Sequence, residues 1–221
     1  MNAFKKISQF FKVYRVSRKT AGSLIYLPRI KEIRDCLGPF QADKIGLTDS
    51  ITLDLGCGTQ PRNPFNAKNT FGIDIREDLT KNIKYADLTI EPIPFAENHF
   101  DYVTAFDFLE HIPRVIYTPN HQFPFVRLMN EVWRVLKPNG YFLSHTPIYP
   151  YSEVFRDPTH VNIFTHETFP LYFDDAIKAA AMYGFTGSFR IIGQYLAEPH
   201  LISILQKTPK DAVQNSLQKR L

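Results

Sequence analysis

Two stretches of this chain decide its fold: Thr52-Leu53-Asp54-Leu55-Gly56-Cys57-Gly58-Thr59 and, further along, Phe71-Gly72-Ile73-Asp74-Ile75. Each is predicted to contain a short buried strand, and a glycine turn follows the first. Glycines in that turn allow the backbone to approach a ligand closely with its N–H groups pointing outward. The two stretches therefore predict a nucleoside-bearing cofactor at the carboxyl end of a parallel sheet.

Strand and helix patterns alternate from residue 50 onward. Strands are predicted over 50–55, 70–75, 84–87, 100–106, 140–146, 188–196 and 200–207. Helices are predicted over 107–112, 122–137 and 174–183, and the second of them is expected to stop at Lys137-Pro138-Asn139-Gly140. Such alternation is typical of an α/β fold with a parallel sheet and helices on both faces. The last two strands are expected to form a closing pair.

Three acids stand at or near the ends of successive predicted strands. Asp54 would be a costly buried charge unless a cationic ligand group or ordered polar contacts satisfied it. Asp74 can accept both ribose hydroxyls, and Asp87 can accept from an exocyclic amine. Any one of them could be a loop or capping residue, but three behind one glycine turn favour a cofactor site.

A nicotinamide dinucleotide is the competing cofactor. Its fingerprint, Gly-x-Gly-x-x-Gly, must open a helix, and Pro61 stands where the third glycine would be. Because Pro61 and Pro64 prevent a long helix from starting there, residues 60–68 are predicted to form an irregular loop. A dinucleotide is therefore disfavoured.

The complete motif set resembles the class I S-adenosylmethionine-dependent methyltransferases, of the kind called methyltransferase type 11. The resemblance covers about residues 50–207 and rests on 54–58, 72–74, 86–88, 93–103, 106–112 and 131–140. It implies a Rossmann-like, mostly parallel seven-stranded sheet with an antiparallel last strand, and S-adenosyl-L-methionine as cofactor. The implied cofactor-binding residues are Asp54, Gly56, Cys57 and Gly58 near the methionine part, Asp74 and Ile75 at the ribose, Asp87 and Leu88 at the adenine, and Phe106 packed beside them. Gln60 departs from the family, which often has a third glycine at that position.

Acceptor residues are expected after the fourth and fifth strands. His145 and His160 are plausible bases at neutral pH, and Asp157 could orient one of them. These three are the predicted catalytic residues, although each histidine could instead only satisfy loop backbone. His111 is assigned a packing or capping role. Because the spacing of Asp157, His160 and His145 is not diagnostic of a metal site, no metal is predicted.

Two further segments bear on the acceptor. Residues 157–169 resemble methyltransferases of bacterial surface-polysaccharide biosynthesis, and the long connection 113–126 is predicted to be a lid. The predicted function is S-adenosylmethionine-dependent methyl transfer (EC 2.1.1 class), directed to oxygen, on a small-molecule or glycan acceptor. The alternatives are a quinone, lipid or nucleic-acid acceptor, or a methyltransferase-like binding protein without turnover.

Basic charge is concentrated at the N-terminus. Residues 1–35 carry nine Lys or Arg and two acids, a local charge of +7 against +4 for the whole chain. Aromatics at helical spacing accompany these bases over 3–20. The pattern suits either a solvated basic face or peripheral contact of 1–35 with an anionic membrane. Nucleic acid is not expected, because no zinc spacing or RNA-binding aromatic signature is present.

Domain limits and location follow from composition. We expect a basic helical segment over 1–45, a cofactor-binding domain over 46–207 and a tail over 208–221. The absence of a long apolar run and of a secretory pattern predicts no transmembrane helix. Of the two cysteines, Cys36 and Cys57, the second lies in the glycine turn, so we expect no disulfide and a reducing compartment. The expected location is the cytoplasm, with possible contact to the inner face of the membrane; the oligomeric state is left open.

Overall fold

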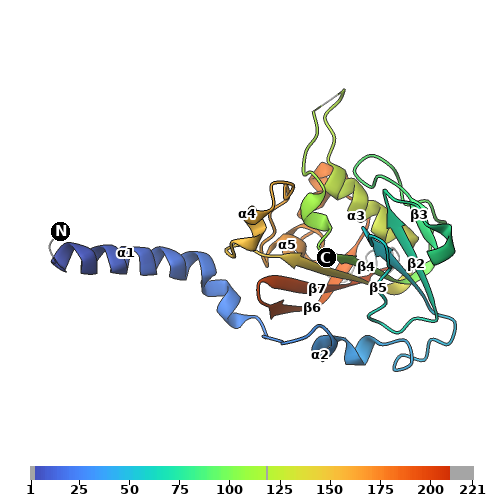
Figure 1. The fold of residues 1–221 in the computed structure, drawn as a ribbon, viewed down its shortest axis with the longest axis horizontal. Helices are drawn as coiled ribbons and strands as arrows, with labels where there is room; N and C mark the ends of the chain where they lie inside the picture. Colours follow the sequence, from blue (N-terminus) through green and yellow to red (C-terminus); the bar gives the residue numbers. More distant parts are fainter. Residues whose placement is uncertain (1–2, 118, 210–221) are drawn as a thin grey trace, which may run out of the picture.

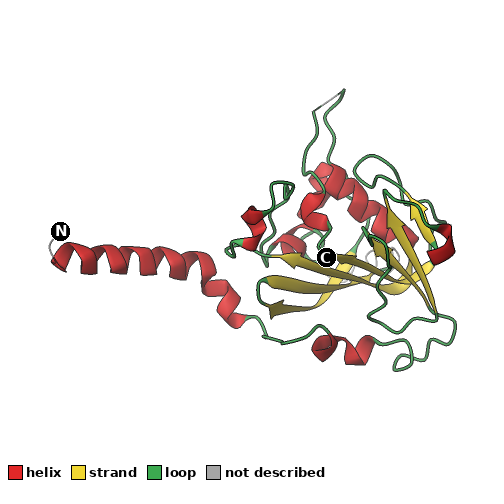
Figure 2. Ribbon diagram, viewed as in Figure 1, coloured by secondary structure: helices red, strands yellow, loops and turns green. Residues whose placement is uncertain are grey.

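The computed structural model describes residues 3–117 and 119–209, and within them a seven-stranded sheet forms the centre of the molecule (Figures 1 and 2). Its order is β3-β2-β1-β4-β5-β7-β6. The strands are β1 (Ile51–Leu55), β2 (Asn69–Asp74), β3 (Ile83–Tyr85), β4 (Phe100–Phe106), β5 (Leu136–Pro147), β6 (Phe189–Ala197) and β7 (His200–Lys207). Neighbours among β1–β5 pair in parallel, and β7 runs antiparallel to both β5 and β6. The predicted Rossmann-like α/β sheet with a reversed last strand is confirmed.

Helices cover both faces of this sheet, as Figure 1 shows for α3 (Pro124–Val135) and α2 (Arg34–Leu37). The other α-helices are α1 (Ala3–Ala21), α4 (Glu153–Arg156) and α5 (Thr168–Tyr172), and short 3-10 turns occupy Gly22–Tyr26, Gly38–Phe40, Leu79–Lys81, Leu109–His111 and Ala179–Tyr183. Pro124 is the first residue of α3, where a backbone N–H would have no hydrogen-bond partner within the helix. The absence of an N–H on proline therefore costs nothing there. The buried stripe of α3 has the i, i+3, i+4, i+7 spacing of one helical face and consists of Phe125, Leu128, Met129 and Val132.

Alternation along the central strands divides the core into two layers. Leu53 and Leu55 of β1 pack in the layer that contains α3, whereas Tyr102 of β4 packs in the layer that contains Cys36 and Leu37 of α2. Parallel strands covered in this way are buried throughout, and β4 is buried at every position except its last. The carboxyl ends of β1, β2, β4 and β5 therefore meet at one edge, where a ligand can reach them.

The predicted helix over 174–183 is wrong. No helix begins at Asp174, because its Oδ1 accepts the N–H of Ala176 at 3.0 Å and its Oδ2 accepts the N–H of Ile191 at 2.8 Å. Lys178 then adopts a left-handed φ of +53°. Only the 3-10 turn Ala179–Tyr183 remains of the prediction. Local side-chain bonding to backbone has outcompeted the helical pattern.

Two other predicted helices are shorter than expected. The range 107–112 forms only the 3-10 turn Leu109–His111. The helix over 122–137 ends at Val135 and passes directly into β5, so residues 137–140 form an irregularity inside a strand instead of a loop. Asn139, at a φ of +64°, supplies the left-handed residue of that irregularity.

The N-terminal segment has two structurally distinct parts. Leu24 packs with Leu196 and Leu201, and Ile30 donates its N–H to the carbonyl of Leu196, so the chain from residue 24 follows the β6–β7 edge. By contrast, α1 extends away from this body (Figure 1). Cys36 and Cys57 are both free thiols. Within the described ranges no helix has the length and apolarity needed to cross a bilayer; of the predicted tail, residues 210–221 lie outside these ranges.

Candidate active site

The glycine turn lies between β1 and the edge where the strands end. Gly56 and Gly58 have φ values of +62° and +63°, which side chains other than glycine rarely adopt. A Cβ on Gly56 would also stand 2.1 Å from the ring of Phe108. Gly58 donates its N–H to Asp74 Oδ2 at 2.9 Å, which links the turn to the end of β2.

Asp54 is a buried acid beneath this turn, with 1% of its surface exposed. Oδ1 accepts from Thr104 Oγ1 at 2.7 Å and Oδ2 from the Arg62 N–H at 2.8 Å. Burial raises the pKa of Asp54 to about 6, and these hydrogen bonds offset only part of that effect. Burial, together with the charges of Asp54 and Asp74, raises the pKa of Cys57 to about 12. The turn therefore has a negative field that favours a cationic ligand group and keeps the thiol protonated.

Asp74 is held by its neighbours but retains capacity to bind. Burial alone would raise its pKa, but hydrogen bonds from Arg76 and Gly58 outweigh burial and lower it. Oδ1 accepts from the Arg76 N–H at 3.0 Å and from its Nε at 2.9 Å, whereas Oδ2, within the described part of the chain, accepts only from Gly58. Because the Arg76 side chain is largely exposed, it can move aside and release Oδ1 to a ribose hydroxyl.

Asp74→Ala should weaken binding of S-adenosylhomocysteine by about tenfold to a hundredfold, because hydrogen bonds to a charged group contribute about 1.5–3 kcal/mol each. Isothermal titration calorimetry would measure the change. Asp78→Ala is the matched control, since that acid is partly exposed and its side chain contacts Thr80 and Lys81 of its own turn. If the Asp74 variant and the unmodified protein bind S-adenosylhomocysteine with equal affinity, Asp74 does not bind the ribose.

The other predicted residues near β2 and β3 differ in accessibility. Ile75 is 66% exposed, so its side chain is free to contact a ligand. Asp87 is half-buried, and its Oδ1 already accepts the N–H of Thr89 at 2.9 Å. Leu88 is a core side chain, packed with the α3 layer. Any contact of Leu88 with a cofactor would therefore come from its backbone.

Phe106 connects the cofactor side of the site with the acceptor side. Its ring lies 5.5 Å from that of His145, and the Arg62 guanidinium stands 4.7 Å from its centroid. A cavity of about 770 Å³ lies beside it. Its lining consists of Ile33, Cys57, Thr59, Gln60, Pro61, Arg62, Asn63, Pro64 and Phe106.

The loop over 60–68 is irregular, as predicted, and is closed by one side chain. Asn63 accepts the N–H of Ala67 at 2.8 Å and donates to its carbonyl at 2.7 Å. Arg62 projects from this loop with an exposed side chain. Sequence reasoning did not assign it a role, yet it is a cation next to the glycine turn.

These residues fit S-adenosylmethionine. The negative field at Asp54 and Asp74 suits its sulfonium and ammonium groups, the Asp74 carboxylate suits its ribose, and Arg62 can neutralise its carboxylate. A glycine turn without side chains at two positions allows the close approach that this requires.

A cluster of one acid and two histidines lies at the ends of β4 and β5. Asp107 follows β4 with a φ of +48° and donates its N–H to the carbonyl of His145 at 2.9 Å. Asp107 Oδ1 lies 3.0 Å from His200 Nε2 and 3.3 Å from His145 Nδ1, and the two imidazoles stack at 4.2 Å. Burial would raise the pKa of Asp107, but the two imidazoles lower it well below its usual range. Asp107 is therefore a charged partner for an imidazole.

A second cluster lies beside it and contains Glu110, His111 and His160. Glu110 is 1% exposed; its Oε2 accepts from Thr146 Oγ1 at 2.9 Å. Burial raises the pKa of Glu110. The rings of His111 and His160 meet edge to face at 4.8 Å.

The three predicted catalytic residues are thus divided between two clusters. His145 belongs with Asp107, and His160 belongs with Glu110. Asp157 orients neither imidazole directly: its Oδ1 accepts from the N–H and Oγ1 of Thr159, and these hydrogen bonds lower its pKa. Asp107, Glu110 and His200 were given no role by sequence reasoning, and His111 only a packing or capping role.

A cavity of about 460 Å³ joins the two clusters. It is lined by Asp107, Glu110, Pro147, Glu153, Arg156, Asp157, Pro158, His160 and His200. Asp107 from the first cluster and His160 from the second thus face the same space. Its volume lies within the range of small-molecule binding sites.

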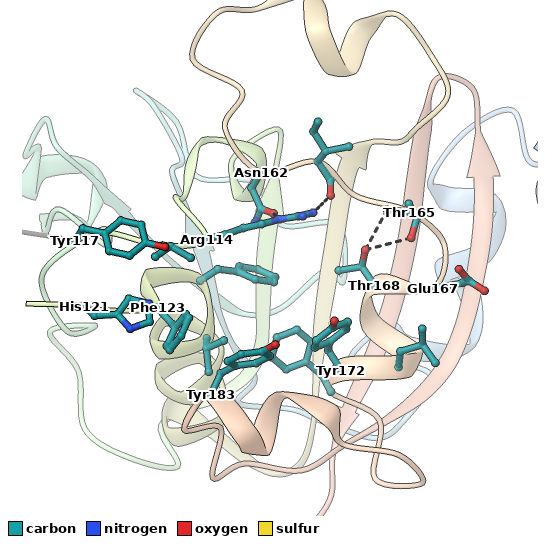
Figure 3. A pocket seen from close by; sticks show the side chains of 16 residues that line it. Arg114, Tyr117, His121, Phe123, Asn162, Thr165, Glu167, Thr168, Tyr172 and Tyr183 are labelled. Atoms are coloured by element: carbon teal, nitrogen blue, oxygen red, sulfur yellow. Dashed lines mark hydrogen bonds between the residues drawn. The ribbon is translucent and has the colours of Figure 1, made fainter. Parts of the chain in front are cut away.

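The connection predicted as a lid lines a different cavity, of about 630 Å³ (Figure 3). Arg114 crosses it to bond Asn162 Oδ1 at 2.6 Å and the carbonyl of Ile163. Aromatic side chains of this connection, Tyr117 and Phe123, face Tyr172 of α5 across the space (Figure 3). The role of residues 113–126 as a lid over the acceptor therefore remains a prediction.

Comparisons with known proteins agree with this geometry. A family model described as a methyltransferase domain matches residues 53–144. No curated protein matches the chain. Among solved structures, the (4+2)-cyclase SpnF is similar over 80% of this chain and 80% of its own, with 17% identity and a TM-score of 0.50. A chain from the complex between the Haloferax volcanii Trm112 methyltransferase activator and the putative methyltransferase covers 80% and 98%, with 13% identity and a TM-score of 0.50.

A putative methyltransferase from Bacillus halodurans covers 73% of this chain and 94% of its own, with 15% identity and a TM-score of 0.48. The two structures with a TM-score of 0.50 show a shared fold, and their low identities show nothing about the acceptor. The family model, the sheet order and the acid–glycine motif point in the same direction. Residues 53–144 therefore carry a methyltransferase domain of the class I S-adenosylmethionine-dependent superfamily, with S-adenosylmethionine as cofactor.

Proposed function

We propose that the protein methylates a hydroxyl group of a small molecule or of a terminal sugar in a glycan. One observation carries this proposal: the Asp107 carboxylate holds the His200 imidazole at 3.0 Å on the wall of the 460 Å³ cavity, where β4 and β5 end. An acid–imidazole pair at this place is suited to removing a proton from an acceptor hydroxyl.

When bound, S-adenosylmethionine supplies a methyl group already activated by its sulfonium. The Nε2–H group of His200 donates a hydrogen bond to Asp107. The lone pair of Nδ1 is then available to receive the proton of the acceptor hydroxyl. The negative charge of Asp107 then stabilises the imidazolium. His145 is not on the cavity wall; stacked behind His200 at 4.2 Å, it is a positioning residue in this proposal.

A labelled-methyl transfer assay against fractionated cell extract tests the proposal, because the label marks whichever molecule accepts the methyl group. We expect label in a low-molecular-weight or glycan fraction, in a linkage that resists mild base as an ether does. Label in nucleic acid, lipid or quinone fractions would support the alternative acceptors. Binding of S-adenosylhomocysteine without transfer to any fraction would support a binding protein without turnover.

We also propose that α1 holds the protein at an anionic membrane surface. Ile7, Phe10, Phe11 and Tyr14 share one helical face, and each is more than half exposed. Six Lys or Arg and no acid occupy the α1 sequence. An amphipathic basic helix of this kind lies in the membrane interface, and each base near an anionic surface contributes about 1 kcal/mol.

Flotation with vesicles that contain phosphatidylglycerol should carry the full-length protein upward, and about 0.5 M salt should reverse this. Phe10→Ser/Phe11→Ser should abolish flotation by removing the two most exposed aromatic side chains of that face. Val13→Ser is the matched control, because Val13 is equally exposed but lies outside the face. Equal flotation of both variants, or concentration-dependent dimerisation through α1 in place of vesicle binding, would contradict the proposal.

A further inference from the structure

A buried carboxylate oxygen without a partner marks the second cluster. Glu110 Oε1 is buried and, among the described residues, has no hydrogen-bond partner, whereas Oε2 accepts from Thr146. Leaving a charged oxygen unsatisfied in such a place is costly. A cation bound at Glu110 would remove that cost.

Hydrogen bonds determine which ring nitrogen carries the proton in the two histidines of this cluster, His111 and His160. His160 Nδ1 lies 3.2 Å from the carbonyl of Val154, which can only accept, so Nδ1 carries the proton. Thr159 donates its hydroxyl to Asp157 at 2.6 Å and therefore accepts from His111 Nδ1 at 2.9 Å. Both imidazoles are left with an Nε2 lone pair. Histidines that bind metals have this arrangement, with the other ring N–H held by a carbonyl or a similar acceptor.

The donor atoms are close enough to share one ion. One nitrogen of each histidine and one carboxylate oxygen of Glu110 lie within 4.8 Å of one another. Tetrahedral ligands at about 2.0–2.1 Å from Zn²⁺ are about 3.4 Å apart. Side-chain rotations that move the three donor atoms by about 1 Å would therefore complete the coordination.

We propose that Glu110, His111 and His160 form a binding site for one divalent transition-metal ion, with Zn²⁺ as its probe. Two imidazoles and one carboxylate favour ions such as Zn²⁺ or Fe²⁺ over Mg²⁺, which prefers oxygen ligands alone. Glu110 and His160 line the 460 Å³ cavity, so the remaining coordination positions face it.

The neighbouring set of Asp107, His145 and His200 is the weaker candidate. The carboxylate oxygen of Asp107 is already 3.0 Å from His200 Nε2. Both atoms are therefore occupied by the acid–imidazole contact. In the Glu110 cluster, Oε1 has no hydrogen-bond partner among the described residues, and both histidines keep an Nε2 lone pair because their Nδ1 atoms carry the proton. If the proposed function is correct, the ion would also hold the acceptor hydroxyl and make it more acidic; the binding site itself does not depend on that reaction.

The test is metal binding to the full-length protein without cofactor or acceptor. After EDTA treatment and dialysis, calorimetric titration with ZnCl₂ should show one site per chain, and MgCl₂ should show none. His160→Gln should weaken Zn²⁺ binding by at least about a hundredfold, because loss of a mere hydrogen-bond partner of a ligand already costs about tenfold to a hundredfold. Co²⁺ substitution should give a visible absorption band that the same variant loses.

His200→Gln is the matched control, because it removes an imidazole from the other cluster on the same cavity. It should leave Zn²⁺ affinity unchanged. Glu110→Gln should weaken binding as His160→Gln does, with circular dichroism confirming that the buried substitution still folds. No Zn²⁺ binding, binding that survives His160→Gln, or binding lost in His200→Gln would each overturn the proposal. None of these outcomes bears on methyl transfer, which the extract assay measures separately.

Discussion

Asp107→Asn should lower the methyl-transfer rate constant by about a hundredfold to ten-thousandfold, which is the usual contribution of a positioned general base. The amide keeps the shape of the carboxylate but removes its charge. It therefore stabilises the imidazolium of His200 less and no longer fixes the proton on Nε2. The effect should appear in kcat, because Asp107 is not among the residues that surround the glycine turn. Rates with the acceptor fraction found in the extract assay would measure it.

The control substitutions separate catalysis from folding and cofactor binding. Asp49→Asn makes the same chemical change at an exposed acid paired with Lys68 and should leave the rate unchanged. His200→Gln should reproduce the loss seen in Asp107→Asn, and the double variant should lose little more, because residues that act as a unit are not additive. Loss of S-adenosylhomocysteine affinity in Asp107→Asn, or full activity of His200→Gln, would contradict the assignment.

Asp54→Asn should weaken S-adenosylhomocysteine binding at pH 7.5 and abolish its pH dependence near pH 6. In the unmodified protein Asp54 has a pKa of about 6, so affinity should rise as pH increases through that value and the carboxylate gains its charge. The ligand's own ammonium and carboxylate groups keep their charges between about pH 5 and pH 7, the interval around the pKa of Asp54. Calorimetry across this interval would show a sigmoidal rise for the unmodified protein and a flat line for the variant.

The same substitution should stabilise the fold. The pKa of Asp54 rises from 3.8 to about 6 on folding, so the folded state holds its proton more tightly than the unfolded state. Stability must then fall as pH rises from about 4 to about 6, and the ionised acid costs about 3 kcal/mol above that interval. Asn can still accept from the Arg62 N–H and donate to Thr104. Thermal unfolding should therefore shift upward by several degrees at pH 7.5 and little at pH 4; an unchanged pH 7.5 midpoint would contradict this.

The cofactor side could be recognised from the sequence because its parts are local. A buried strand, two glycines and an acid within residues 52–59 predict a sharp turn at a strand end, and the structure has Gly56 and Gly58 at positive φ there. Asp74 then reaches Gly58 because parallel strands of similar length end at the same edge. The positions of these groups follow from strand period and glycine geometry.

The predicted helix over 174–183 shows where such local reasoning ends. Its apolar spacing is compatible with a helix, but Asp174 bonds the backbone of Ile191, a residue seventeen positions away. No pattern within a short window includes that partner, and the competition between side chain and helix was decided by β6.

The acceptor side was decided by tertiary structure. Sequence reasoning selected His145, His160 and Asp157 because they follow the fifth strand, where the acceptor is expected, but the structure assigns the two histidines to different acids. Asp107 meets His200 only because β7 inserts beside β5 and brings its first residue to the end of β4. Strand ends and glycine turns are set by short-range sterics, which a sequence displays directly, whereas the pairing of an acid with a distant imidazole is set by strand order.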